Sequence, residues 1–208
     1  MIKLFLKAKH WQLFTLMFGL PIVFQIFIMI SMFANIGANG NPNPETFFNL
    51  FKLFPIVMLL YMGLFFGWFW SIAIGLQGKV PVNIKMKTKK FKIFFFIPLV
   101  YILSISIFIA GLFGGIMESG NEPNVAYIGG VFGIIIPLHL LSMFGIFYSM
   151  YFVAKTFKTV QLQKEVGFAD FAGEFFMIWF YFIGIWILQP KINMMQNEKS
   201  EITTDKDF

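Results

Sequence analysis

Four long stretches of this sequence contain no aspartate, glutamate, lysine or arginine: residues 11–44, 53–78, 93–117 and 123–154. Each is longer than the roughly 20 residues that a helix needs to cross about 30 Å of hydrocarbon. Only 12% of the 208 residues are charged and 58% are hydrophobic, a balance that a water-soluble globule of this length cannot bury. We therefore expect an all-α fold, a polytopic transmembrane helical bundle with four long spanning helices.

A fifth apolar stretch, residues 175–190, is too short to cross the membrane by itself. It becomes long enough if it begins near Ala169 and places Glu174 at the level of the headgroups. We expect this fifth, shorter element over 169–190 to cross, and the alternative is a re-entrant or interfacial helix that turns back. Residues 191–208 are polar, and we expect them to form a disordered tail.

Lysines are distributed unevenly among the segments that connect the spans. The N-terminus carries three, residues 79–92 carry six, and residues 155–168 carry three against one glutamate, whereas the alternate loops are acidic. Because basic residues are retained on the cytoplasmic side, we expect a cytoplasmic N-terminus and a multi-pass topology. The apolar part of the N-terminus is too long for a cleaved signal peptide, so we expect it to remain as the first span. The expected helices lie near 11–36, 47–77, 91–117 and 126–157.

All sixteen basic residues are lysine. The absence of arginine favours an AT-rich genome, and with it a bacterial inner membrane. The lysine block from Lys79 to Lys92 is tethered between two spans. We therefore expect it to contact anionic lipid headgroups of the bilayer rather than nucleic acid.

Residues 54–70 and 136–152 repeat one pattern. The matching positions are Pro55 and Pro137, Leu59 and Leu141, Gly63 and Gly145, and Phe65 and Phe147. Tandem duplication of a helical hairpin, with repeats 11–78 and 91–160 in a single domain 1–190, would produce this pattern. Chance identities explain it equally well in a chain so rich in phenylalanine, leucine and isoleucine, and both interpretations stay open.

Small residues four positions apart allow membrane helices to approach closely. The expected packing positions are Gly63, Gly67, Gly111, Gly115, Gly129, Gly133 and Gly145. The pairs 111/115 and 129/133 lie at similar depth on either side of a short loop. We expect a tight hairpin contact between them.

His139 is the ionisable side chain that lies deepest in an expected span, and such groups are candidates for function. Ser142 and Ser149 continue along its helix face, and Gln25 and Tyr101 from other helices would complete a small polar site. The alternative is structural: the imidazole satisfies a carbonyl freed by the neighbouring proline, and the serines bond to their own helix.

Several function classes are excluded. The chain has no cysteine and only two histidines, so it holds neither a thiolate-ligated nor a multi-histidine metal site. Nucleotide-binding, zinc-protease and serine-hydrolase motifs are missing. We expect a non-enzymatic protein without metal or cofactor, an accessory or permease-like subunit that needs a protein partner or a second copy. The alternative is a self-sufficient transporter of small solutes or lipids with His139 at the midplane.

Overall fold

The computed structural model describes residues 2–39, 54–119 and 125–204, and every secondary-structure element in these ranges is a helix. The elements are α1 (Ile2–Lys7), α2 (His10–Phe14), a π-helical turn η1 (Thr15–Gly19), α3 (Leu20–Asn39), α5 (Phe54–Gly75), a 3-10 turn η2 (Gln77–Lys79), α6 (Thr88–Ser119), α7 (Val125–Leu162), α8 (Phe168–Trp179) and α9 (Tyr181–Thr204). Four helical segments are long and apolar enough to span a membrane: His10–Ala34, Pro55–Lys79, Thr88–Ile109 and Gly129–Leu162. The all-α bundle expected from the sequence is confirmed.

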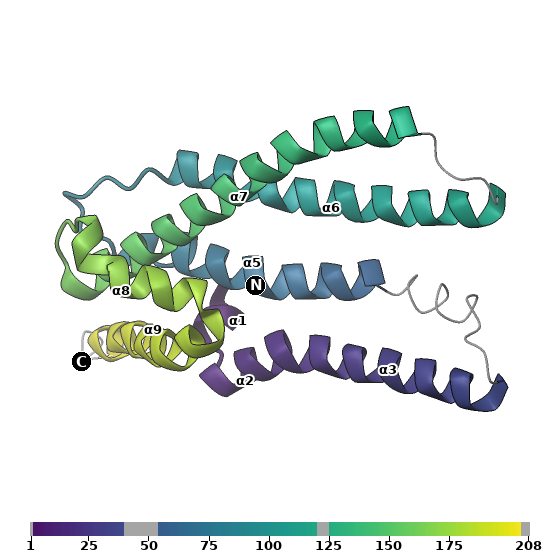
Figure 1. The fold of residues 1–208 in the computed structure, drawn as a ribbon. Helices are drawn as coiled ribbons and strands as arrows, with labels where there is room; N and C mark the ends of the chain where they lie inside the picture. The colour runs from purple at the N-terminus through teal and green to yellow at the C-terminus, as the bar shows by residue number, and fades with distance from the viewer. Residues whose placement is uncertain (1, 40–53, 120–124, 205–208) are drawn as a thin grey trace.

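The first span is one continuous rod made of α2, η1 and α3 (Figure 1). Pro21 lies inside this rod, where it cannot donate a hydrogen bond to the carbonyl of Met17 and its ring crowds that carbonyl. The widened π-helical turn directly before Pro21 gives the carbonyl room, because one extra residue in the turn shifts the hydrogen-bonding register. The proline therefore adjusts the helix without ending it.

The lysine-rich segments meet at one end of the molecule. Gln163, at the end of α7, donates from Nε2 to the carbonyl oxygen of Lys79 at 3.2 Å, which joins the α7–α8 connection to the α5–α6 connection. Helix α1 packs on the same end, since the side chain of Ile2 covers Gly75 at the close of α5. We call the region formed by α1, residues 79–92 and the last turns of α7 the lysine end.

Most of the close packing lies toward this lysine end. Its largest buried side chains come from four helices, namely Trp68 and Phe69 of α5, Phe91 of α6, Phe157 of α7 and Phe171 of α8. Toward the other end, α3 and the α6–α7 pair lie on opposite sides of α5 and separate (Figure 1). The bundle is thus held together at one end.

Helices α8 and α9 form a hairpin that enters the bundle and returns to the lysine end (Figure 1). The chain turns at Phe180, and the hydroxyl of Tyr181 at the tip accepts a hydrogen bond from Tyr61 of α5 at 2.8 Å. At the far end of the return, the ammonium group of Lys79 donates to the carbonyl oxygen of Met195. The two ends of the hairpin therefore lie at the same end of the bundle.

This hairpin differs from the single crossing helix expected over 169–190. Helix α8 has 12 residues and is about 18 Å long, too short to cross about 30 Å of hydrocarbon. Gly184 lets α9 fold back against α8, because a Cβ at this position would lie 1.8 Å from the carbonyl oxygen of Met177. Residues 191–204, expected from the sequence to be part of a disordered tail, belong to α9, since this helix continues through Pro190 to Thr204; residues 205–208 lie outside the described residues.

Candidate functional site

The structure brings together two of the five residues expected to form a polar site. Tyr101 of α6 and His139 of α7 face each other, with 3.1 Å between the tyrosine hydroxyl oxygen and Nδ1 of the imidazole. Their rings meet edge to face, with centroids 5.6 Å apart. His139 is nonetheless exposed on the surface of the bundle rather than enclosed within it.

The other three residues lie elsewhere. Ser142 and Ser149 are buried in α7, and the Ser149 hydroxyl donates to the carbonyl oxygen of Gly145 on its own helix at 2.8 Å. Gln25 is exposed on α3, and no described side chain forms a hydrogen bond with its amide. These residues do not converge on a shared cavity with Tyr101 and His139, so the described structure contains no single polar site of the expected composition.

The expected packing glycines have different surroundings. A Cβ at Gly145 would lie 2.7 Å from the carbonyl oxygen of Phe94, so α6 and α7 approach backbone to backbone there. No atoms lie within 4 Å of a Cβ built at Gly111, Gly129 or Gly133, and the surroundings of Gly115 lie outside the described side chains. Helices α6 and α7 therefore pack closely near Pro98 and Gly145 rather than at the expected glycine pairs beside their connecting loop.

Sequence reasoning missed a buried polar cluster at the lysine end. The indole Nε1 of Trp68 donates to Oε1 of Gln189 at 2.9 Å, and Nε2 of Gln189 donates to the carbonyl oxygens of Phe5 at 2.9 Å and Ala8 at 2.8 Å. Asn193, one turn further along α9, donates to the carbonyl oxygens of Leu6 at 2.8 Å and Ala8 at 3.2 Å. We call these three side chains, Trp68, Gln189 and Asn193, the polar clasp.

The polar clasp supplies hydrogen-bond donors to the carbonyl groups that the break between α1 and α2 leaves unpaired. The last carbonyls of a helix have no partner within the helix, and burying them unpaired is unfavourable. Instead of continuing α1, the backbone N–H of Lys9 donates to the side chain of Gln12, which leaves the carbonyl of Phe5 for Gln189. The two amides are four residues apart and so share one face of α9, but Pro190 and Lys191 lie between them and the sequence does not single out this pair.

A buried ion pair lies beside the clasp helices. The ammonium group of Lys158 on α7 is 2.6 Å from Oε1 of Glu174 on α8, and the two side chains are 19% and 6% exposed. From the sequence, Glu174 at headgroup level can pair with Lys155 or Lys158 or act at the helix N-terminus, and the structure pairs it with Lys158. The pair fixes the α8–α9 hairpin to α7, since breaking a buried pair leaves an uncompensated charge.

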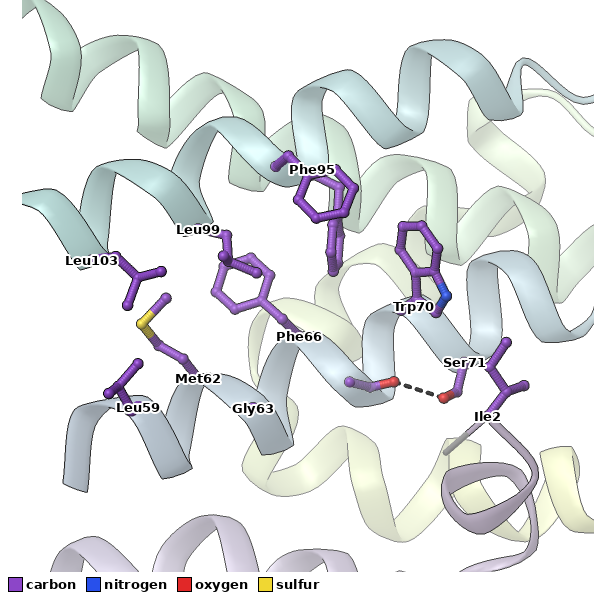
Figure 2. A pocket seen from close by; sticks show the side chains of 12 residues that line it. Ile2, Leu59, Met62, Gly63, Phe66, Trp70, Ser71, Phe95, Leu99 and Leu103 are labelled. Carbon is purple, nitrogen blue, oxygen red and sulfur yellow. Dashed lines mark hydrogen bonds between the residues drawn. The ribbon is translucent and has the colours of Figure 1, made fainter. Parts of the chain in front are cut away.

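An apolar groove runs between α5 and α6, with a volume of about 390 Å³ (Figure 2). Its lining is apolar except for Ser71, whose hydroxyl donates to the carbonyl oxygen of Gly67 at 2.7 Å and so offers little to a ligand. The groove is open at Gly63, where no atoms lie within 4 Å of the position that a Cβ would take. The groove is suited to an apolar occupant and not to a polar substrate.

Comparison with protein-family models, with curated proteins and with solved structures finds no match to this chain. Among the described residues, no three histidine, aspartate or glutamate side chains lie close enough to hold a metal ion. The chemistry available at His139 is a single hydrogen bond to a phenol.

Proposed function

We propose that this chain is a non-enzymatic accessory or permease-like subunit of a bacterial inner-membrane complex. The observation that carries the proposal is the exposure of Gln25 near the middle of the first span, with no hydrogen bond to any described side chain. Placing an amide in hydrocarbon without a hydrogen-bond partner costs up to several kcal/mol of free energy. A helix from another chain that offers a polar group at this depth would satisfy it.

The shape of the bundle supports the same proposal. The helices separate away from the lysine end, and α3 and the α6–α7 pair lie on opposite sides of α5 (Figure 1). His139 lies exposed on that α6–α7 pair. A partner helix that packs beside α3 or α7 would therefore meet a polar side chain at mid-depth.

The proposed orientation places the lysine end in the cytoplasm. The N-terminal helix, residues 79–92 and the end of α7 lie together at this end, and lysine-rich segments are typical of the cytoplasmic side. Anionic headgroups of the inner leaflet would contact this surface. The duplication of a helical hairpin stays a prediction, since the equivalent positions Gly63 and Gly145 have different surroundings.

A second candidate function is a self-sufficient transporter of small solutes or lipids. Its support is the Tyr101–His139 pair, a polar contact held between two spans. A transporter needs a hydrated path to this pair, but Gln25, Ser142 and Ser149 do not line one with it. Replacing His139 with alanine tests this candidate. If the chain is such a transporter, the variant should lose uptake in the native host while its abundance stays normal.

Cysteine cross-linking tests the subunit proposal, because the chain has no cysteine of its own. We expect a Gln25→Cys variant, treated in native membranes with a short bifunctional reagent, to form a covalent adduct with a different protein chain. The matched control is Met17→Cys on the same rod, because Met17 is buried and should form no adduct. Purification of Gln25→Cys as an unlinked monomer without co-purifying chains would contradict the proposal.

A further inference from the structure

We propose that the groove between α5 and α6 binds one anionic phospholipid, with an acyl chain in the groove and the phosphate beside Lys92 and Lys89. The site rests on the headgroup contact proposed above for the lysine end, and it does not depend on the protein partner. Its evidence is the shape of the groove, its length and the charge at one of its ends.

The shape of the groove results from two glycines of α5. Gly63 has open space where a side chain would lie, and at Gly67 the ring of Phe5 lies 2.7 Å from the position that a Cβ would take and closes the floor. Phe66 and Met62 form one wall, and α6 forms the other (Figure 2). The open space at Gly63 thus leaves a channel beside α6, while Phe66 and Trp70 of α5 still pack against Phe95 of α6.

The length of the groove corresponds to one leaflet. Its α5 lining runs from Leu59 to Ser71, a rise of about 18 Å at 1.5 Å per residue. Half of a hydrocarbon core of roughly 30 Å is about 15 Å. A single acyl chain that starts at the lysine end would therefore extend along most of the groove.

The charge lies at the end where a headgroup would be. Trp70 lines the groove beside Ile2 of α1, and the Lys92 ammonium group lies 5.9 Å from the centroid of the Trp70 ring. Lys92, Phe96, Leu99 and Leu103 follow a helical spacing of four, three and four residues along one face of α6, and the last three line the groove. Lys89 precedes Lys92 by three residues on this face and is exposed.

The arrangement favours an anionic lipid over a zwitterionic one. A phosphate that carries net negative charge gains attraction from Lys92 and Lys89, whereas the choline of phosphatidylcholine places a cation beside them. A neighbouring lysine changes the affinity of an anionic headgroup by about fivefold. An ordinary boundary lipid would not show this selectivity or survive delipidation.

The experiment uses the full chain, purified in mild detergent and delipidated, and then mixed with phosphatidylglycerol or phosphatidylcholine. Native mass spectrometry counts the retained lipids. We expect one phosphatidylglycerol per chain, retained at least fivefold better than phosphatidylcholine. Gly63→Leu should abolish retention by filling the groove, whereas Gly133→Leu, which also faces open space, should not. Lys92→Gln should reduce retention about fivefold, and Lys85→Gln on the exposed loop should leave it unchanged.

A second measurement locates the acyl chain. Phosphatidylglycerol brominated at mid-chain should quench part of the tryptophan fluorescence of a variant whose Trp11, Trp179 and Trp186 are replaced by phenylalanine, which leaves Trp70 in the groove and the fully buried Trp68. Gly63→Leu should relieve this quenching. Equal retention of the two lipids, or unchanged retention in folded Gly63→Leu, would overturn the proposal. The proposal would also be overturned if the parent chain were a dimer and Gly63→Leu dissociated it, because a second copy would then occupy the groove.

Discussion

Replacing Gln189 with leucine tests whether the polar clasp holds the lysine end together. The substitution keeps the side chain's approximate volume but removes the three hydrogen bonds of the Gln189 amide. Ala8 keeps a donor, because Asn193 also bonds its carbonyl oxygen at 3.2 Å. Two buried groups lose their described partner: the indole N–H of Trp68 and the carbonyl of Phe5.

The expected loss in the free energy of unfolding follows from these two groups. A buried polar group left unpaired costs about 1–3 kcal/mol, which gives roughly 2–6 kcal/mol for both. Polar bonds between membrane helices average only about 0.6 kcal/mol each, so three lost bonds set the lower limit near 2 kcal/mol. We therefore expect Gln189→Leu to destabilise the chain by about 2–4 kcal/mol.

The assay is unfolding by a denaturing detergent titrated into mixed micelles, followed by tryptophan fluorescence and far-UV circular dichroism. Gln25→Leu is the matched control: it makes the same substitution at an exposed amide that no described side chain bonds, and should change the stability by less than about 0.5 kcal/mol. Trp68→Phe combined with Gln189→Leu should cost less than the sum of the single variants, because each removes a partner of the other. Equal stability of Gln189→Leu and the parent chain would refute the reasoning.

Three further predictions concern the α8–α9 hairpin. Gly184→Ala should destabilise the chain by about 1–3 kcal/mol and expose α9 to protease, because its Cβ would lie 1.8 Å from the carbonyl oxygen of Met177, whereas Gly173→Ala in open space should be neutral or stabilising. Single cysteines at Lys85 and Met194 should react with a membrane-impermeant maleimide from the same side of the membrane, and reaction from opposite sides would show that the element crosses. Glu174→Gln should lower the free energy of unfolding by about 1.5–3 kcal/mol, because it removes the charge-assisted bond to Lys158. Glu165→Gln, on the exposed connection between α7 and α8, should change the stability very little. Equal losses of stability in the two variants would contradict this role for the pair.

The four spans can be predicted from the sequence because lipid imposes a simple requirement. A spanning helix must be apolar for about 20 residues whatever its neighbours are, so charge-free runs locate it. The α8–α9 hairpin is harder to predict, since 169–190 contains enough apolar residues for either a single crossing helix or a chain that turns back. Whether the chain turns back depends on the close approach of Gly184 to Met177. This contact forms between two helices, and its only trace in the sequence is the glycine.

The polar residues show the same limit more clearly. His139 can be identified because an ionisable side chain is conspicuous in a span, and its contact with Tyr101 is found. Its expected companions are separated because Gln25 lies on a helix that packs beside α5, far from the α6–α7 contact, and Ser149 is satisfied by its own helix. Gln189 lies near the end of the expected fifth element, where nothing in the sequence distinguishes it. Its importance comes from the carbonyls of α1, whose need for donors arises only once the helix breaks.

The clasp also constrains the order in which the chain completes its fold. Its bonds to the carbonyl oxygens of Phe5, Leu6 and Ala8 join residues 181 to 187 positions apart, between the beginning of the chain and its last helix. Spanning helices can enter the bilayer one at a time, because each satisfies its own backbone, but the carbonyls of Phe5, Leu6 and Ala8 have to wait for α9. Helix α1 also packs on α5, but we expect its carbonyl groups to be fully paired only after the α8–α9 hairpin has formed. Until then the lysine end is unfinished, and Gly75 and the groove beside Ile2 stay uncovered. Loss of α9 should consequently release α1 and open the proposed lipid groove while leaving the four spans inserted.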